Sequence, residues 1–369
     1  MRILYLESFY GGSHREVADA LVAYSAHEIE LRTLPARFWK WRMRGAGLHF
    51  AHDIDDISTY GLVVCSGLMS VADFIALARA RCSSPRKLPP VLLYAHETQL
   101  AYPAPEAREA DLHFAFTDLT NMLVADHVAF NSHTHRDAYL AALQPFLRRL
   151  PEYRPMWVRA EVERRSSVCH PGIRFATNGV TELADDTGAP LILWNHRWEF
   201  DKNPQAFFES LREVKARGGA FRLALLGENF QVVPKPFTAA REEFADEIVH
   251  YGYVPDRASY EAWLTRADIV VSTSIQENFG ISVVEAIVHG AAPLLPRRLS
   301  YPEIIPEQYH DSLYDTDDEL ASKLLAMLTA GERPRASEGL VRHARSFRWE
   351  RAVKHFDALF ERISGAAHG

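Results

Sequence analysis

Short runs of apolar residues recur along this chain of 369 residues, and most are followed by a polar turn and a longer segment with helical spacing. Runs of this kind are typical of strands buried on both faces of a parallel sheet that helices cover. The predicted strands of the first half are 3–6, 62–65, 91–94, 113–116 (followed by a turn at 117–118) and 129–130. Those of the second half are 191–194, 222–226, 248–249, 269–272 and 292–295.

The stretch 177–190 interrupts this alternation, because it is polar, rich in turn-forming residues and without an apolar period. A chain of this length also exceeds what one hydrophobic core usually supports. The predicted fold is therefore α/β, with two Rossmann-like domains facing a cleft. Their predicted bounds are 1–176 and 191–345, with a final helical segment at 346–369 that returns to the first domain.

Charge and cysteine content narrow the class of protein. The net charge is −7; residues 1–175 contain 20 Lys and Arg against 19 Asp and Glu, which leaves 21 against 29 for the rest. Only the first half could therefore offer basic patches to a polyanion. Cys65, Cys82 and Cys169 lack metal-site or redox spacing, which favours a reducing, cytoplasmic setting. The apolar run near the start of the sequence reaches an acid at Glu7 and is too short for a signal peptide. No run approaches the roughly 20 apolar residues of a membrane span.

The densest chemistry lies at 272–290, where a predicted strand gives way to a helix that begins near Ile281. The first-turn N–H groups of such a helix can hold a diphosphate, and Gly280 allows its close approach. Glu277 is placed to reach hydroxyls of an attached sugar, and Glu285 to accept hydrogen bonds from ribose hydroxyls. A carboxylate within an apolar run needs a partner, which favours a binding role for Glu285 over a solvated helix position.

A second cluster at 194–204 follows the first strand of the second half. Arg197 and Lys202 are predicted to project from this loop into the cleft, where two fixed cations can neutralise a leaving diphosphate without a metal. Taken alone, they could equally pair with Glu199 and Asp201. The presence of both patterns, R-x4-K and E-x7-E, each after a strand, favours the donor site.

Polar residues also follow the predicted strands of the first half, at the sheet edge where such folds bind ligands. They are Gly12, Ser13 and His14 after the first strand, His96, Glu97 and Gln99 after the third, and Asn131 after the run at 129–130. His96 is the candidate for contacting the transferred sugar or the acceptor hydroxyl, although a lone histidine is more often structural. A double-glycine turn is likewise common in structural loops.

Aromatic and basic residues alternate at the segment that contains Trp39, Lys40, Trp41, Arg42 and Arg44. Such side chains can stack on bases and hold phosphates at once. Composition alone favours an amphipathic packing segment with a solvated basic face.

The R-x4-K and E-x7-E patterns, the latter containing E-N-F-G, resemble the GT-B retaining glycosyltransferases of family 4 over residues 190–305. The resemblance implies that Arg197 and Lys202 bind donor phosphates, and that Glu277 and Glu285 bind the donor sugar and ribose. Further donor contacts are implied for Asn278 (a position more often Gly in that family), Phe279, Gly280 and Ile281. Tyr253 stands where the family holds the nucleotide base, and could equally be a core residue.

The mechanism expected on this basis is a front-face, retaining transfer in which the acceptor hydroxyl loses its proton to the departing phosphate. No protein nucleophile and no metal ion are required.

A closer resemblance covers most of the chain. The segments L-Y-L-E-S-F-Y-G-G-S-H (4–14), F-W-K-W-R-M-R (38–44), H-E-T-Q-L-A-Y-P (96–103), F-N-S (130–132) and R-R-L-S-Y-P-E-I-I-P (297–306) are similar to the tRNA-queuosine α-mannosyltransferase family. Ordinary family 4 enzymes lack several of these segments. The stretch 145–165 is individual to this chain and carries none of the resemblance.

This resemblance implies transfer of mannose from GDP-mannose, as co-substrate, to queuosine in a tRNA anticodon stem-loop of the Asp type, with no cofactor. It assigns Gly12 and Ser13 to the donor. It assigns to the tRNA the residues His14, Trp39, Lys40, Trp41, Arg42, Arg44, Glu97, Gln99 and Asn131.

Three other functions stay open from sequence. One is a family 4 transferase acting on a small metabolite, a glycan or a lipid head group. Another is a GT-B sugar-nucleotide epimerase, which would convert its substrate without an acceptor. The third is a non-catalytic tRNA-binding module, which would have no use for four donor-site residues.

Overall fold

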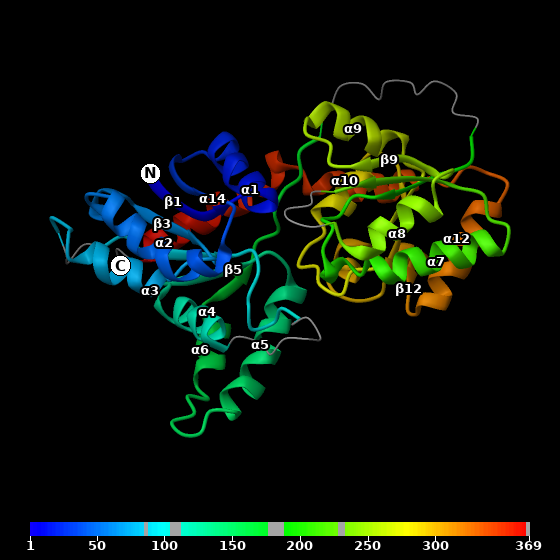
Figure 1. Cartoon of the computed structure of the whole chain (residues 1–369). Helices are drawn as coiled ribbons and strands as arrows, with labels where there is room; N and C mark the ends of the chain where they lie inside the picture. The colour runs from blue at the N-terminus through cyan, green and yellow to red at the C-terminus, as the bar shows by residue number, and fades with distance from the viewer. Residues whose placement is uncertain (85–87, 104–111, 176–187, 228–232, 367–369) are drawn as a thin grey trace. The chain divides into compact units, whose positions relative to one another are not determined.

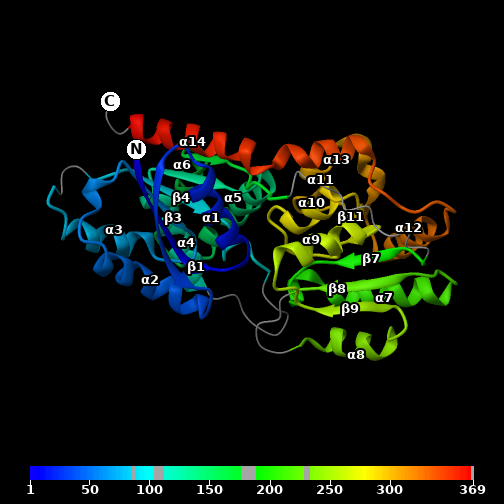
Figure 2. The ribbon, with the colours of Figure 1, turned by 90° about the horizontal axis from the view of Figure 1, so that it is seen from above.

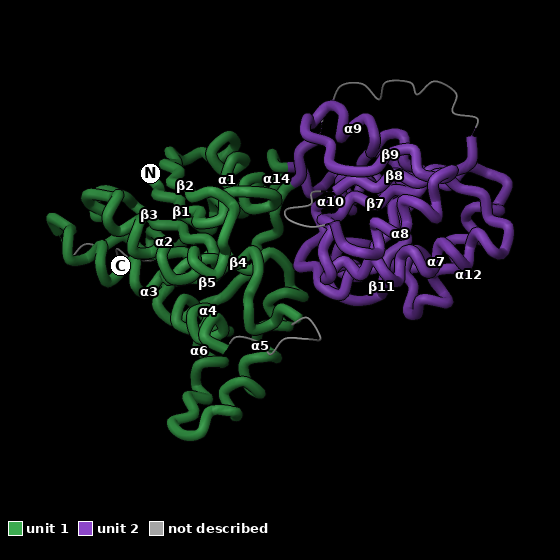
Figure 3. The backbone as a smooth tube through the Cα atoms, viewed as in Figure 1, with its two compact units in different colours: residues 1–172, 349–369 green, residues 173–348 purple. Residues whose placement is uncertain are grey.

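The chain divides into two compact units, shown in Figure 3. The structure is a computed structural model that describes residues 1–84, 88–103, 112–175, 188–227 and 233–366. Unit 1 consists of Met1–Gly172 and Trp349–Gly369, and unit 2 of Ile173–Arg348. Each unit contains a sheet of six strands whose neighbours pair in parallel, so the predicted α/β fold class with two Rossmann-like units is confirmed. Most of the linker expected at 177–190 lies outside the described residues.

The sheet of unit 1 has the strand order β2-β1-β3-β4-β5-β6. The strands are β1 (Arg2–Tyr10), β2 (Glu28–Pro35), β3 (Leu62–Ser66), β4 (Val91–Ala95), β5 (His127–Phe130) and β6 (Ser166–Val168). The helices are α1 (Gly12–Tyr24), α2 (Trp39–Asp53), α3 (Val71–Arg79), α4 (Leu112–Val124), α5 (His133–Arg148), α6 (Val158–Arg164) and α14 (Trp349–Ala366), with the short 3-10 turn η1 (Ile57–Thr59).

Alternate residues along the strands of unit 1 enter two separate cores, as the period of two in a strand requires. In β1, Leu4 and Leu6 face the core formed with α2 to α6, whereas Ile3 and Tyr5 face the core formed with α1 and α14. Figure 2 shows α14 lying along the sheet, and it contacts both α1 and β3. The last helix of the chain therefore completes the layer over one face of the first sheet.

The sheet of unit 2 has the order β12-β11-β10-β7-β8-β9. Its strands are β7 (Leu191–Trp194), β8 (Arg222–Leu226), β9 (Ile248–Gly252), β10 (Ile269–Val271), β11 (Ala292–Pro296) and β12 (Leu313–Tyr314). Its helices are α7 (Pro204–Ala216), α8 (Lys235–Glu243), α9 (Arg257–Arg266), α10 (Ile281–Val288), α11 (Tyr301–Ile304), α12 (Asp317–Thr329) and α13 (Glu338–Ala344), with 3-10 turns η2 (Phe200–Lys202), η3 (Glu307–Ser312) and η4 (Arg345–Phe347).

Numbered from β7, the order of the second sheet is that of dinucleotide-binding Rossmann sheets, in which the strand order reverses between the first and fourth strands. That switch point lies between β7 and β10, which are neighbours in the sheet. Leu191 and Leu193 face the helices α9, α10, α11 and α13, whereas Ile192 and Trp194 face α7, α8 and α12. Figure 1 shows these layers. The loops after β7 and β10 are thus the expected ligand-binding loops of unit 2.

One predicted strand is wrong. Residues 113–116, expected as a strand, and the turn expected at Thr117 and Asp118 all lie within α4. The buried residues of this segment recur at helical spacing, at Phe114, Asp118 and Met122, so its apolar run belongs to a helix face. A short apolar run does not by itself distinguish the two structures.

Three strands, β2, β6 and β12, were not predicted. Each is the outermost strand of its sheet. β2 is half-exposed, and β6 and β12 are only 3 and 2 residues long, so none contains the long buried run that marks a central strand. Among the described helices, none is both long and apolar enough to cross a membrane.

Candidate functional site

The loops after β7 and β10 meet at the switch point of unit 2 and join the two sequence motifs expected there. Lys202, at the end of η2, donates from Nζ to the main-chain oxygen of Gln276 at 2.7 Å and to Oε2 of Glu277 at 3.2 Å. The main-chain oxygen of Asp201 accepts from the N–H groups of Ile275 and Gln276 at 2.9 and 3.2 Å. Main-chain and side-chain bonds therefore fix the two loops against each other.

Lys202 is a buried cation held between two acids. Its side chain is 9% exposed, and Nζ lies 3.3 Å from Oδ2 of Asp201 as well as 3.2 Å from Glu277. Burial opposes the charge, but the carboxylates of Glu277 and Asp201 outweigh burial and raise the pKa of Lys202. Burial acts to raise the pKa of the Glu277 carboxyl, but Lys202 and His196 outweigh burial and lower that pKa below its usual value. Both partners are therefore ionised at neutral pH.

The turn before α10 depends on a glycine. Gly280 has φ 97°, a left-handed conformation that other residues adopt at a cost. It is the N-cap of α10, and it has no side chain to cap the first turn of the helix, whose N–H groups are of the kind that can bind an anion. Ser300 Oγ donates to the main-chain oxygen of Phe279 at 2.9 Å, and the Phe279 side chain is buried. Of Phe279, only the main chain is therefore placed to contact a donor.

Glu285 lies on the buried face of α10 with two protein partners. Its Oε1 accepts from Nη1 of Arg257 at 2.7 Å, and its Oε2 accepts from the hydroxyl of Tyr260 at 3.1 Å. Burial and, to a smaller extent, the charge of Glu285 raise the pKa of Tyr260 well above its usual value. The phenol therefore stays neutral and donates. These two contacts hold the carboxylate that is predicted to bind the ribose.

Sequence analysis missed Arg257 and Tyr260. They stand three positions apart and therefore on one side of α9. That Arg-x-x-Tyr spacing is too common to identify a site by itself.

The Arg197 loop is anchored by its neighbour. Trp198 stacks on Phe237 with ring centroids 4.2 Å apart and is buried, whereas the Arg197 side chain is 42% exposed and lies 3.4 Å from Glu199. His196, also missed from sequence, is buried with Nδ1 3.3 Å from Oγ of Ser282. Burial and, to a smaller extent, the charge of Lys202 lower the pKa of His196 to about 4, so the His196 ring is neutral.

Two other predicted donor residues lie at the surface of unit 2. Tyr253 follows β9 and is 59% exposed, which excludes the alternative that it is a core residue. Asn278 accepts at Oδ1 from the side-chain amide of Gln276 at 2.9 Å. Ile281, the first residue of α10, is partly exposed.

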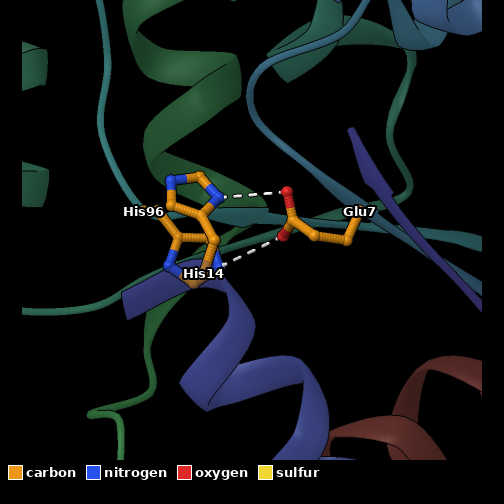
Figure 4. Close-up of side chains that lie close together, drawn as sticks. All are labelled: Glu7, His14 and His96. Carbon is orange, nitrogen blue, oxygen red and sulfur yellow. Dashed lines mark hydrogen bonds and ion pairs between the residues drawn. The ribbon is translucent and has the colours of Figure 1, made fainter. Parts of the chain in front are cut away.

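In unit 1, the ends of β1 and β4 and the first turn of α1 bring Glu7, His14 and His96 together (Figure 4). Nδ1 of His14 lies 3.1 Å from Oε1 of Glu7, and Nε2 of His96 lies 3.9 Å from Oε2. All three are buried, and the two imidazole rings stack with centroids 4.0 Å apart. Burial, with smaller contributions from His14 and His135, lowers the pKa of His96 well below its usual value. His96 is therefore neutral.

Two histidines and a carboxylate are ligand types of zinc and related metals, so this cluster is the described group that could hold a metal. The ring planes of His14 and His96 lie only 22° from parallel. The nitrogen lone pairs lie in those planes, and nearly parallel planes do not meet close to both rings. The two rings are therefore poorly oriented to bind one ion together. Glu7 is hydrogen-bonded to Nδ1 of His14, whereas Nε2 of His96 lies beyond hydrogen-bond distance from it.

The loop after β4 is held by a chain of polar side chains. Asn131 donates from Nδ2 to the main-chain oxygen of His96 at 2.9 Å, and its Oδ1 lies 2.8 Å from Nδ1 of His135. Nε2 of His135 lies 3.2 Å from the hydroxyl of Thr98. Because the Asn131 oxygen is an acceptor, His135 donates at Nδ1 and accepts at Nε2. Asn131 thus positions the His96 loop from within the unit.

Asp118 holds the same loop and was not predicted as a site residue. Its Oδ2 accepts from the main-chain N–H of Gln99 at 2.5 Å and of Leu100 at 3.2 Å. Burial raises the pKa of the Asp118 carboxyl to about 8, against the opposing effect of these two amides. The Gln99 side chain donates to Oε1 of Glu97 at 3.2 Å.

The aromatic and basic residues at the start of α2 divide into two groups. Trp41 is 76% exposed, and Lys40 and Arg44 are also at the surface. Trp39 is only partly exposed and packs on Phe114 with centroids 5.1 Å apart. This segment therefore combines a packing face with a surface of cations around one exposed indole.

Arg42, Gly12 and Ser13 complete the predicted set. Arg42 donates to the main-chain oxygen of Pro35 at 3.3 Å. Gly12, at φ 51°, and the exposed Ser13 form the start of α1. The structure thus places the Arg197 and Lys202 loop, Glu277 and the start of α10 around the switch point of unit 2, whereas Tyr253 follows the edge strand β9. The predicted residues of unit 1 lie around the ends of β1, β4 and β5 and the start of α2.

Two protein families match successive parts of the chain. Residues 2–173 match the family described as tRNA-queuosine alpha-mannosyltransferase N-terminal, and residues 180–338 match glycosyl transferases group 1. The tRNA-queuosine alpha-mannosyltransferase of Drosophila melanogaster is 34% identical over 331 residues, which cover 87% of this chain and 85% of that protein.

Solved structures with the same architecture are more distant in sequence. Sucrose-phosphate synthase from Thermosynechococcus elongatus has a TM-score of 0.71 at 14% identity, covering 99% of this chain and 100% of that one. Anabaena HepE, crystallised with UDP and glucose, has a TM-score of 0.66 at 13% identity, covering 98% and 99%. These likenesses show the fold, which is GT-B.

Replacing Asp118 by Asn tests the raised pKa. Between about pH 4 and pH 8 the unfolded chain carries an ionised Asp118 and the folded chain a protonated one, so rising pH removes stability from the wild type. The contribution is complete below about pH 4 and lost at about pH 8. Each pH unit in this window changes the free energy of unfolding by up to about 1.4 kcal/mol.

Asparagine resembles the protonated acid and does not titrate. We therefore expect urea unfolding over a range from about pH 5 to pH 9 to show Asp118→Asn gaining stability relative to the wild type up to about pH 8, with no further gain above. A difference independent of pH would contradict the assignment.

Proposed function

This chain belongs to the tRNA-queuosine α-mannosyltransferase family, and on that premise we propose that it moves mannose from GDP-mannose to queuosine in the anticodon of a tRNA of the Asp type. The observation that carries the donor half of the proposal is the buried Lys202–Glu277 pair beside the uncapped start of α10. The match of residues 2–173 to the family's own N-terminal region supports the acceptor half.

Unit 2 would hold the donor. The α10 amides, Lys202 and Arg197 supply positive charge for the diphosphate, and Lys202 needs no reorganisation because its partners already fix it. One carboxylate oxygen of Glu277 accepts from Lys202, and the carboxylate also accepts hydrogen bonds from hydroxyls of the mannose. Glu285 receives the ribose, and the exposed ring of Tyr253 stacks on guanine.

The transfer would retain configuration at the sugar. The bond between the mannose C1 and the β-phosphate oxygen breaks, and a hydroxyl of the queuosine cyclopentenediol bonds to C1 on the same face. The hydroxyl proton passes to the departing phosphate, so the products are GDP and the mannosylated nucleoside. The residues of unit 2 stabilise the charge that develops on the diphosphate, and no protein nucleophile is needed.

Unit 1 would hold the acceptor. His96 is neutral and fixed at the end of β4, so it can share a hydrogen bond with an acceptor or sugar hydroxyl without carrying charge. The exposed Trp41, with Lys40 and Arg44, suits an RNA loop, where bases stack on aromatic rings beside phosphate contacts. A cytoplasmic location follows from a tRNA substrate and agrees with three free, buried cysteines.

The decisive experiment is mass spectrometry of tRNA nucleosides after incubation with a panel of sugar nucleotides. We expect a hexose added to queuosine only with GDP-mannose and only in queuosine-containing tRNA. Hexose on queuosine from another donor would reassign the donor. Transfer to a small acceptor but not to tRNA would reassign the acceptor, and conversion of the sugar nucleotide without an acceptor would indicate an epimerase.

Arg197→Ala tests the donor cations with little risk to folding, because Arg197 is partly exposed and its ion pair lies at the surface. We expect kcat/KM to fall by about 10²-fold, the scale of losing one positioned charge-stabilising group. Arg212→Ala removes an equally exposed arginine paired with Glu243 in the same unit, and is the matched control. Equal rates in the two variants would contradict the role of Arg197.

Lys202→Ala is a less direct test. It would also leave Glu277 and Asp201 buried without their cation, at a cost of about 3–5 kcal/mol of stability.

Treatment with EDTA tests metal independence. Since protein cations supply the charge for the diphosphate, we expect the transfer rate to stay unchanged after EDTA and gel filtration. A loss of rate that zinc or manganese restores would contradict this and direct attention to Glu7, His14 and His96.

A further inference from the structure

The segment between α5 and α6 is a part of unit 1 that the proposed function leaves unused. α5 ends at Arg148 and α6 begins at Val158. Figure 1 shows the end of α5 and the following loop extending away from the strands of the unit. We call residues 148–159 the α5–α6 tip. It lies within residues 2–173, the part of the chain that matches the family's N-terminal region.

The tip exposes large side chains while its base is buried. Tyr153 is 89% exposed and Trp157 61% exposed, whereas Val158 and Leu147 are buried. Tyr153 also has φ 49°, a left-handed conformation uncommon for a bulky residue. Exposed aromatic rings on a supported hairpin are available to stack on a partner.

The charge of the tip is opposite to that of the whole chain. Its Arg148, Arg149, Arg154 and Arg159 are all exposed, against a single acid, Glu152, in a chain of net charge −7. Within the part of the chain that the structure describes, none of the four arginines forms an ion pair with a carboxylate. By contrast, Arg164 at the end of α6 and Arg165 directly after it both pair with Glu161. The positive charge of the tip is therefore not neutralised by the protein.

We propose that the α5–α6 tip binds the tRNA outside its anticodon stem-loop, with its arginines on backbone phosphates and with Tyr153 and Trp157 against a base or sugar. Uncompensated arginines beside exposed aromatic rings favour nucleic acid as the partner. This inference rests on the proposed function, and it extends the acceptor contacts to a second region of the substrate.

The length of α5 explains why only a large acceptor would use the tip. The helix begins at His133, directly after Asn131 and Ser132 at the end of β5, and has 16 residues. At about 1.5 Å per residue, it separates its two ends by roughly 24 Å. A nucleoside bound near Asn131 cannot reach the tip, whereas the rest of a tRNA can.

The test compares full-length queuosine tRNA with a short anticodon stem-loop in the triple variant Arg148→Ala, Arg149→Ala and Arg159→Ala. Arg154 is kept, because its Nε donates to the main-chain oxygen of Leu150 within the loop. The matched control removes three exposed cations of α14, by Arg351→Ala, Lys354→Ala and Arg362→Ala. Melting curves verify that both variants are folded.

For the tip variant, we expect KM for full-length tRNA to rise on the order of tenfold with kcat unchanged. The slope of log KM against log salt should fall by about 2 to 3, roughly one unit for each phosphate that the variant no longer binds. KM for the stem-loop should stay unchanged. Trp157→Ala should raise KM for full-length tRNA without altering the salt slope, and the α14 control should alter neither.

An unchanged KM and salt slope for full-length tRNA in the tip variant would overturn the inference, and would leave a protein partner for this surface. An equal rise in KM for the stem-loop would also overturn it, since the contact would then lie in the anticodon arm. If the wild type modifies no tRNA, the proposed function fails. Filter binding of the same tRNA to the wild type and the tip variant then decides the inference by itself.

Discussion

The burial of one lysine between two carboxylates organises the donor side of this protein. Removing three charges from water is costly, and it is tolerated only where they remain paired in good geometry. Lys202 meets that condition by bonding both to Glu277 and to the main chain of the loop that carries it. These bonds fix the loop in place. They therefore also fix the turn at Gly280 and the start of α10, which follow that loop.

Burial also explains the state of the histidines around the two groups of site residues. His96, His135 and His196 all have lowered pKa values, with burial as the largest cause in each. Neutral imidazoles have one donor and one acceptor nitrogen, so each ring has a definite hydrogen-bond direction. In unit 1 this gives a directed chain from Thr98 through His135 to Asn131 and the main chain of His96. These bonds fix the loop after β4 from within unit 1.

The sequence allowed most of the fold to be predicted, because central strands of a parallel sheet are buried on both faces and are marked by continuous apolar runs. Lys202 and Glu277 could be placed at one edge since each lies in the loop that follows such a strand. Residues 113–116 were misassigned because a short apolar run fits a helix face equally well. The edge strands β2, β6 and β12 were missed because they are partly exposed or very short. Arg257 and Tyr260 were missed for another reason. Their partner Glu285 is more than twenty positions away, and only the packing of α9 beside α10 brings them together.

Unit 1 is discontinuous, which has a consequence for how the chain is made. Its sheet is complete once β6 has been synthesised, but one face is covered by α1 and by α14, whose Trp349 and Phe356 are buried there. Unit 2 is continuous and lies wholly before α14 in the chain. During synthesis, therefore, unit 2 can reach its native state first, and the earlier-made strands of unit 1 keep an uncovered apolar face until α14 has left the ribosome. Synthesis of α14, rather than synthesis of the sheet, is the event that closes the first unit.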